Sequence, residues 1–564
     1  MKIKTSSGNT YWYDYISNEI SVHTGQEEII PPCVNYLKVP DYKVLPVLEH
    51  FILEITRDCN LRCSYCCYSG RYAMHRRHEN RSMDAGMIDH VIAFIEKVRN
   101  HQRKLTFSMY GGEPFLCPDM IRYTIQQCKM VFPQDTVYTI STNSVLLDEK
   151  MLLYCVENGV ILNVSIDGAP FIHDRYRRDK LGMPTYEVVH NRLSLIKKAY
   201  PQYWKEHVRL FVTLDSLSQL EEIAQYWGDD DVLRQKAPTA ISTIAPNYDK
   251  KNYNKTVERR NEIDAIMSLL FYYERNRENQ FCAGFFERFV YEIVNRKIYN
   301  IPSSIYPIVC LPENHRCFID VYGNIGICEK VCDTLRFGNI IKGIDMEAVN
   351  DIVQEHVAIK KRRCVNCWAF RLCKTCFTNY GYSEEAWDED CNNSRLLVYW
   401  QLLITLELAE RQMLSNDVEA HLRKLIPKDI NSIKRIMSED NVIRYMDYLS
   451  NCQTEEGATM LYELLTNENV SDDRSVMVYG IADDDNMLIG VVGVDTVENQ
   501  LGNLFFCLDE NYWGQGIMTA AMSMFLLSFQ KSGIKPYARI SKENHRALNL
   551  MKKFSSVDVE IVDA

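Results

Sequence analysis

The feature that most constrains the fold is an alternation of short apolar runs with helical patterns between residues 50 and 244. Segments with helical periodicity, such as 83–98 and 186–198, separate six runs of strand-forming residues. Alternating β and α units build parallel sheets. The sequence therefore predicts an α/β fold whose six parallel strands curl into a partial (β/α)6 barrel. The predicted strands are residues 50–56, 105–109, 137–140, 160–166, 208–214 and 239–244.

Three cysteines follow the first predicted strand in the spacing C-x3-C-x2-C. They are Cys59, Cys63 and Cys66. Three thiolates can hold a four-iron cluster with one open iron, which can take an exchangeable ligand. The alternative is a zinc site completed by His75 or His78.

Chemistry in such barrels sits at the carboxyl ends of the strands, and a Gly-Gly-Glu sequence follows the second predicted strand. Gly111 and Gly112 allow the backbone to approach a ligand closely. Glu113 beside them can accept hydrogen bonds from an ammonium group.

Polar residues also lie at the ends of the next two strands and within the cysteine loop. Asn143 and Ser165 offer neutral hydrogen bonds suited to a ribose or a carboxylate, and Tyr65 can lay its ring on an adenine. With the cysteine triplet, these motifs resemble the radical S-adenosylmethionine (SAM) enzymes, whose open iron binds SAM and cleaves it reductively. The resemblance implies that the triplet holds a [4Fe-4S] cluster and that the strand-end residues contact SAM. It favours the cluster over zinc.

Composition limits the possible partners. The chain has 564 residues and a net charge of −11, which disfavours a nucleic-acid substrate. The N-terminus lacks an apolar signal segment, and no run of eighteen apolar residues occurs, so we expect a cytoplasmic protein without a membrane partner. Twenty cysteines in a reducing compartment favour metal ligation over disulfides.

A second group of nine cysteines lies between residues 310 and 391. Its spacing, C-x12-G-x4-C and then C-x2-C-x5-C-x2-C, resembles the SPASM extension of radical SAM enzymes that modify peptides and proteins. The alternative for residues 364–376 is a pair of zinc knuckles. The resemblance implies two closed auxiliary [4Fe-4S] clusters, three clusters in all, and leaves Cys332 spare. The first auxiliary set is Cys310, Cys317, Cys328 and Cys376, and the second is Cys364, Cys367, Cys373 and Cys391.

Glu329 directly follows Cys328. In the resembling sulfatase-maturating enzymes, an acidic residue near this place acts as a base, so Glu329 is the candidate catalytic residue. The alternative is a structural salt bridge to Lys330 or Arg336.

The C-terminal region carries a different set of signals. Strand-like runs precede Gly514-Gln515-Gly516, which opens a helix and offers a phosphate site, and Asn544 follows. Residues from about 422 onward resemble the GNAT acyltransferases, which implies acetyl-CoA binding. The usual Gly-Phe is absent near residues 554–556 and the chain stops at Ala564, short of the last strands of that fold. Slow or absent acetyl transfer is therefore expected.

Two further segments lie outside these motifs. Residues 10–22 alternate like a hairpin that turns at Ser17-Asn18. The arginine-rich stretch 71–81 suggests a solvated face, or else a grip on an acidic part of a peptide substrate. The segment before Pro46 is too short for a winged helix that reads a leader peptide, so leader recognition would lie elsewhere or come from a partner protein.

Taken together, the motifs predict four segments: an N-terminal hairpin (1–49), a radical SAM barrel (50–300), a SPASM region with a linker helix (301–420) and a GNAT-like domain (421–564). The resemblance implies an enzyme that abstracts hydrogen from a ribosomally made precursor peptide and forms a thioether or carbon–carbon cross-link. A flavodoxin or ferredoxin would supply the electron. The alternatives are a sulfatase formylglycine generator and a metal-stabilised peptide-binding scaffold without turnover.

Overall fold

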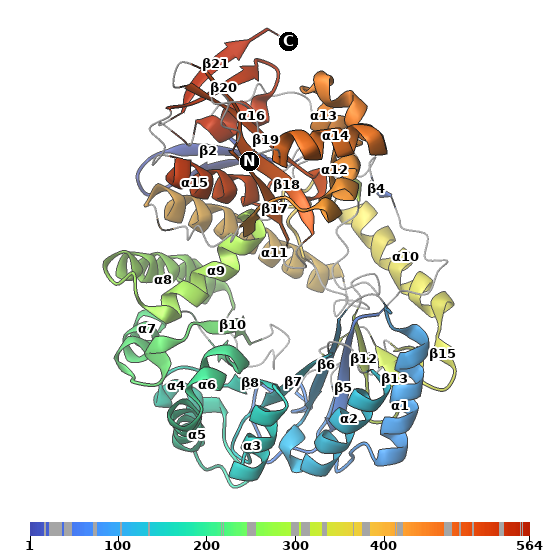
Figure 1. The fold of residues 1–564 in the computed structure, drawn as a ribbon. Helices are drawn as coiled ribbons and strands as arrows, with labels where there is room; N and C mark the ends of the chain where they lie inside the picture. Colours follow the sequence, from blue (N-terminus) through green and yellow to red (C-terminus); the bar gives the residue numbers. More distant parts are fainter. Residues whose placement is uncertain are drawn as a thin grey trace. The chain divides into compact units, whose positions relative to one another are not determined.

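The computed structural model of the chain contains two compact units (Figure 1). The first comprises residues 1–16, 20–290 and 302–411, and the second comprises residues 17–19, 291–301 and 412–564. The residues that the structure describes are 1–15, 19–21, 37–38, 48–71, 76–101, 104–132, 136–215, 217, 219–244, 255–294, 304–305, 316–326, 328–329, 336–364, 366–374, 384–411, 413, 421–466, 477–483, 487–498, 501–529, 535–552, 554 and 557–563.

Six neighbouring parallel strands form the centre of the first unit, in the order β10-β9-β8-β7-β6-β5. The predicted partial barrel is confirmed, and each predicted strand lies within two residues of an observed one. The strands are β5 (His50–Thr56), β6 (Leu105–Gly111), β7 (Thr136–Thr142), β8 (Ile161–Ser165), β9 (Val208–Leu214) and β10 (Pro238–Thr243).

The two faces of this sheet differ in polarity, because side chains alternate along each strand. Phe51, Leu53 and Ile55 of β5 are fully buried on the face that the helices cover (Figure 1). The opposite face lines the inside of the barrel and carries polar residues such as Ser108 and Thr139. The covering helices are α1 (Ala85–Val98), α2 (Pro118–Val131), α3 (Glu149–Glu157), α4 (Pro170–Tyr176), α5 (Tyr186–Ala199), α6 (Pro201–His207) and α7 (Leu220–Asp229).

The same sheet continues past β5 into the cysteine-rich region, which the sequence did not predict. Strand β12 (Arg316–Ile319) pairs with β5 in parallel, and three antiparallel strands follow it. The turn after β12 requires Gly323, whose φ is 77° and whose Cβ position lies 2.9 Å from Ile340. The remaining elements here are β13 (Asn324–Gly326), β14 (Arg336–Asn339), β15 (Gly343–Ile344), α10 (Met346–Arg363) and α11 (Glu384–Glu410).

Two helices follow the barrel, α8 (Lys255–Arg275) and α9 (Gln280–Val294), and a two-stranded sheet joins β4 (Leu37–Lys38) to β11 (Ser304–Ile305). At the N-terminus, β1 (Lys2–Lys4), β2 (Thr10–Asp14) and β3 (Glu19–Ser21) form one sheet. The predicted hairpin corresponds to β2 and β3, whereas β1 was not predicted, and the expected turn at Ser17-Asn18 lies outside the described residues.

The second unit is a six-stranded sheet in the order β16 to β21, as expected for a GNAT-like α/β domain. The strand-like runs predicted before the glycine-rich turn, residues 476–482, 487–495 and 503–508, correspond to β17, β18 and β19. The strands are β16 (His421–Arg423), β17 (Met477–Ala482), β18 (Leu488–Glu498), β19 (Leu501–Leu508), β20 (Lys535–Ser541) and β21 (Asp558–Val562). The helices are α12 (Ile430–Met437), α13 (Asp440–Ile443), α14 (Glu455–Thr466), α15 (Ile517–Phe529) and α16 (His545–Met551).

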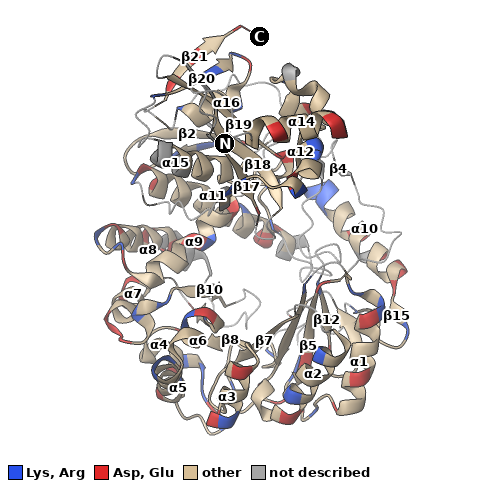
Figure 2. Ribbon diagram, viewed as in Figure 1, with Lys and Arg blue, Asp and Glu red and all other residues tan. Residues whose placement is uncertain are grey.

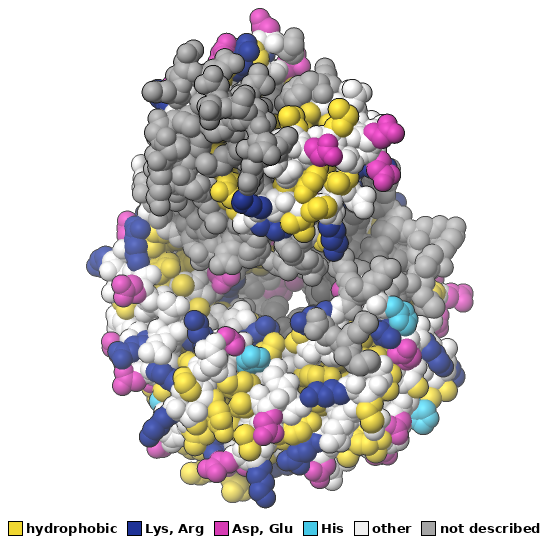
Figure 3. All heavy atoms as spheres, viewed as in Figure 1, with side chains coloured by type: hydrophobic (Ala, Val, Ile, Leu, Met, Phe, Trp, Pro, Cys, Tyr) yellow, Lys and Arg dark blue, Asp and Glu magenta, His cyan; other side chains and the backbone are white. Residues whose placement is uncertain are grey.

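Charges of both signs occur side by side on the outer helices α1, α2 and α3 (Figure 2). On the face shown in Figure 3, apolar side chains are interspersed with charged ones over these barrel helices. Among the helices that the structure describes, none combines the length and apolar character needed to cross a membrane.

Candidate active site

The cysteine triplet lies in the loop that leaves the carboxyl end of β5. The Cys59 sulfur accepts the Leu61 amide at 3.4 Å, and the Cys66 sulfur accepts the Tyr68 amide at 3.4 Å. Burial raises the pKa of Cys59 to about 12, so a free thiol there would be protonated. Amide donors aimed at the sulfurs favour thiolates, and bound metal would supply the charge that removes the protons. The loop therefore suits a metal centre.

The zinc alternative receives no support from the histidine that the structure describes. His78 places Nδ1 3.3 Å from the Arg57 carbonyl and stacks on Tyr68 with ring centroids 5.8 Å apart. His75 lies outside the described residues.

The glycine pair packs directly against the start of the cysteine loop. A Cβ on Gly111 would lie 2.1 Å from the Thr56 carbonyl oxygen, and a Cβ on Gly112 would lie 2.0 Å from that of Asp58. Gly111 also has a φ of 133°, which disfavours other residues. The sequence analysis assigned these glycines to ligand approach, and the structure adds a second requirement, which is contact between β6 and the cysteine loop.

The Glu113 carboxylate is fully buried and accepts three hydrogen bonds. The donors are the Phe115 amide at 3.0 Å, the Thr142 hydroxyl at 2.8 Å and the Asn143 amide at 2.8 Å. Burial raises the pKa of Glu113 to about 7. The side chain thus links the ends of β6 and β7 beneath the cysteine loop.

Asn143 connects the end of β7 to the cysteine loop. Its Nδ2 donates to Asn60 Oδ1 at 2.9 Å and lies 3.8 Å from the Cys59 sulfur. Its Oδ1 accepts the Val145 amide at 3.0 Å. Ser165 is the last residue of β8, half-buried and in register with Phe211 of β9.

Tyr65 belongs to a cluster that the sequence analysis missed. Its hydroxyl donates to Asp167, and the Arg177 guanidinium lies 5.4 Å from the centre of its ring. Arg177 donates to Asp167 at 2.7 Å, and the Thr213 amide donates to the other Asp167 oxygen at 2.8 Å. Asp167 could have been identified from its position, two residues after the end of β8. No sequence pattern pointed to Arg177.

Glu329 lies beside the polar inner face of the barrel. Its carboxylate pairs with Arg316 of β12, and its carbonyl accepts a hydrogen bond from Arg76. It influences the titration of His50, and also of Cys67 and Tyr110 near the cysteine loop. The sequence had suggested Lys330 or Arg336 as its salt-bridge partner, but the partner is Arg316, and Lys330 lies outside the described residues.

A chain of hydrogen bonds crosses the inner face near Arg316. Thr139 donates to Ser108 at 2.9 Å, and Ser108 lies 2.7 Å from His50 Nε2. Burial, with the nearby Arg316 charge, lowers the pKa of His50 to about 4. His50 is therefore neutral at pH 7, and the inner face of the barrel is polar but uncharged at this position.

Buried charges attach the barrel to the hairpin that follows β12. Arg57 lies 2.9 Å from Glu54 and 3.6 Å from Asp320, and all three side chains are at least 96% buried. Glu54 also accepts hydrogen bonds from Tyr68 at 2.5 Å and from the Val321 amide at 3.1 Å. Arg76 lies 3.7 Å from Glu54 and is buried. The suggestion that residues 71–81 form a solvated face is therefore wrong at Arg76.

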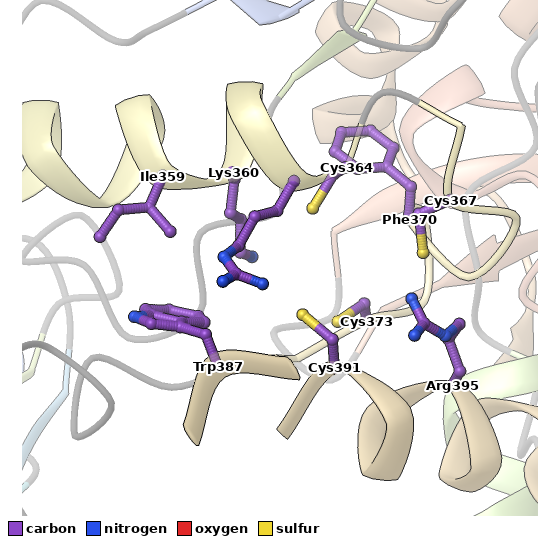
Figure 4. A pocket seen from close by; sticks show the side chains of 10 residues that line it. Ile359, Lys360, Cys364, Cys367, Phe370, Cys373, Trp387, Cys391 and Arg395 are labelled. Carbon is purple, nitrogen blue, oxygen red and sulfur yellow. The ribbon is translucent and has the colours of Figure 1, made fainter. Parts of the chain in front are cut away.

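The second auxiliary cysteine set surrounds a cavity between the end of α10 and the start of α11 (Figure 4). Among the described residues, no three Cys, His, Asp or Glu side chains are arranged to hold a single metal ion. Four cysteines line the cavity, which is the number of ligands that a closed four-iron cluster requires. The four are Cys364, Cys367, Cys373 and Cys391.

The first auxiliary set can be followed only in part. Cys317 is buried on β12 and Cys328 follows β13. Cys310 and Cys376 lie outside the described residues, as does the spare Cys332.

In the second unit, strands β19 and β20 are paired only at their starts, from Leu501 to Asn503. The turn before α15 has positive φ at Gly514 (78°) and Gly516 (80°), while the Gln515 side chain donates to the Asn511 carbonyl at 2.9 Å. Asn544 caps α16 by accepting the Ala547 amide at 3.1 Å. The diverging strands and the turn can receive an elongated ligand with a phosphate at the helix start.

Part of each unit matches a known family model. Residues 53–226 match the radical SAM superfamily, and residues 420–555 match the acetyltransferase (GNAT) domain. The chain is 25% identical over 355 residues to the cysteine-type anaerobic sulfatase-maturating enzyme of Clostridium perfringens, which covers 58% of this chain and 88% of that protein. It is 27% identical over 135 residues to the radical SAM cyclopropyl synthase TigE of Paramaledivibacter caminithermalis, over 22% of this chain and 28% of that one. The solved structure of anSMEcpe with bound AdoMet and a Cp18Cys peptide is similar with a TM-score of 0.48 and 19% identity, over 65% of this chain and 99% of that chain.

Proposed function

The chain is a radical SAM enzyme with a C-terminal GNAT domain, and we propose that it modifies a side chain or α-carbon of a ribosomally made peptide. The observation that carries this proposal is the position of Glu329. Its carboxylate pairs with Arg316 of β12, which lies opposite His50 of β5 in the sheet register. A base in this place can reach a substrate that enters the barrel.

Three groups of cysteines would hold the clusters, with the triplet as the SAM-binding site. The SAM contacts would come from Tyr65, Gly111, Gly112, Glu113, Asn143 and Ser165. When bound, SAM at the triplet cluster supplies a 5′-deoxyadenosyl radical that abstracts hydrogen from the substrate. The electron would come from a flavodoxin or ferredoxin.

Glu329 would take the proton that the substrate releases after hydrogen abstraction. Arg316 occupies Oε2, so the proton would be accepted at Oε1. The Arg316 ion pair and the Arg76 bond to the backbone carbonyl fix the direction of this carboxylate. The neutral His50–Ser108–Thr139 chain lines the wall without adding a competing charge.

Two products are compatible with a base in this position. A thioether or carbon–carbon cross-link is the first proposal, and the similarity to sulfatase-maturating enzymes over 58% of the chain favours formylglycine formation as the second. Mass spectrometry separates them, because both products lose two hydrogen atoms, but a cross-linked peptide keeps its sulfur, whereas formylglycine made from cysteine also exchanges sulfur for oxygen.

Replacing Cys63 with Ala is expected to reduce 5′-deoxyadenosine formation to background, since the triplet cluster loses a ligand. The measurement is anaerobic reconstitution with SAM and dithionite, followed by chromatography of the nucleoside. Cys128→Ala is the matched control, because Cys128 is buried in α2 away from these sites and the change should leave SAM cleavage intact. Equal nucleoside yields from Cys63→Ala and wild type would refute the enzyme proposal and leave the peptide-binding scaffold.

For the GNAT domain we propose acetyl-CoA binding at Gly514, Gln515 and Gly516, with slow or absent transfer to the peptide. Gly516→Glu is expected to weaken acetyl-CoA binding at least tenfold in calorimetry, because it places a carboxylate at the expected pyrophosphate position and a side chain at positive φ. Lys535→Glu, on β20 and paired with Asp558 at 2.6 Å, is the charge-changing control. Equal affinities for Gly516→Glu and wild type would exclude this turn as the binding site.

A further inference from the structure

The cavity around the second auxiliary cysteine set also contains three cations. Lys360 and Arg363 come from the last turn of α10, and Arg395 comes from α11 (Figure 4). Trp387 and Phe370 form apolar parts of the wall. Charges in such surroundings interact more strongly than they do in water.

Lys360 is the most buried of these cations, with 3% of its surface exposed. It lines the same cavity as Cys364, Cys367, Cys373 and Cys391. Burial of an ammonium group is costly unless an opposite charge lies nearby. A buried lysine in this position therefore fits a site whose thiolates carry negative charge.

The two arginines are held at the cavity by partners of their own. Arg363 pairs with Asp388 at 2.6 Å, and Arg395 donates to Asn392 at 2.6 Å. Asp388 is 71% exposed, so water screens its charge more than that of buried Lys360. Lys360, Arg363 and Arg395 thus bring three positively charged side chains to the cavity wall.

We propose that Lys360, supported by Arg363 and Arg395, raises the reduction potential of the cluster held by the second auxiliary cysteine set. The inference rests on the ligand assignment in the proposed function. Reduction adds one electron from an external donor to the iron core, and no bond in the protein forms or breaks. Because the core becomes more negative, fixed positive charge in the cavity stabilises the reduced state. The positive side chains would make this cluster easier to reduce.

The test compares Lys360→Met with Lys361→Met in the full chain. Both changes remove one positive charge from α10, but Lys361 is exposed. Each is combined with Cys59, Cys63 and Cys66→Ala, so that only the auxiliary clusters contribute to a redox titration followed by electron paramagnetic resonance. Lys360→Met is expected to lower one midpoint by 59 mV or more, which is a tenfold change in the one-electron equilibrium. Lys361→Met should leave both midpoints unchanged, and Lys360→Arg should restore the wild-type value.

Iron content distinguishes the possible failures. Lys360→Met with full iron and midpoints equal to those of Lys361→Met would overturn the inference and leave the ligand assignment standing. If replacing Cys364 and Cys367 leaves the iron content unchanged, the ligand assignment itself is wrong. If Lys360→Met does not take up iron, Arg395→Gln decides the matter: a smaller shift in the same direction supports the inference, and an unchanged midpoint overturns it.

Discussion

Glu329→Gln is expected to slow product formation by about 10²–10⁴-fold while 5′-deoxyadenosine still accumulates. The amide keeps the size of the side chain and a hydrogen bond to Arg316, but it cannot accept a proton at Oε1. The base acts after the radical has formed, so SAM cleavage does not depend on it. The measurement is parallel quantification of modified peptide and nucleoside under single-turnover conditions.

Glu347→Gln provides the matched control, since Glu347 is an exposed acid in the first turn of α10. It makes the same change in charge outside the barrel and should not alter the ratio of peptide product to nucleoside. If the ratio is unchanged in Glu329→Gln, Glu329 does not act as the base, and its role is limited to the ion pair with Arg316. A fall in both products together would indicate a damaged site instead of a missing base.

Arg57→Met is expected to lower the free energy of unfolding of the first unit by about 3–5 kcal/mol. The Arg57 side chain is 2% exposed and lies between Glu54 and Asp320, both of which would stay buried with fewer partners. Burial already raises the pKa of Glu54 despite Arg76 and Arg57. Anaerobic denaturant titration of the cluster-loaded protein, followed by intrinsic fluorescence, gives the change in the midpoint of the first transition.

Arg122→Met is the matched surface control. Arg122 pairs with Asp119 at 2.9 Å, but the Asp119 side chain is 84% exposed, so a loss below about 1 kcal/mol is expected. The double variant Glu54→Gln with Arg57→Met should recover part of the loss, because it removes the uncompensated charge. Similar small losses for Arg57→Met and Arg122→Met would show that the buried network adds little net stability.

Local sequence patterns predicted the strands well, because each strand of a parallel sheet is a short apolar run between helices. The helix predicted at 83–98 begins at Ala85, because the Asp84 side chain accepts the Met87 amide and caps it. Two of the motif residues at the strand ends, Gly112 and Asn143, contact the cysteine loop. The partners of the motif residues were harder to predict. The amides that donate to Glu113, and the backbone carbonyl that leaves no room for a Cβ at Gly111, depend on how neighbouring strands pack.

Contacts between distant segments could not be predicted from the sequence. Arg177 reaches Asp167 and Tyr65 only because the loop after α4 folds back over the barrel end. Arg76 looked like part of a solvated basic stretch, yet it stacks 4.2 Å from the centre of the Phe318 ring on β12. No local periodicity encodes such pairs, and the contact of Arg76 with Phe318 depends on the pairing of β12 with β5.

The pairing of β12 with β5 makes the cysteine-rich region a continuation of the barrel and not an appended module. The strand that leads into the cysteine loop has neighbours on both edges, one from the barrel and one from the auxiliary region. A chain cut between these regions would leave an unpaired parallel edge, which invites aggregation. If two such enzymes exchanged their auxiliary regions, the pairing between β5 and β12 would have to be preserved. This requirement limits how new substrate specificities can arise by recombination.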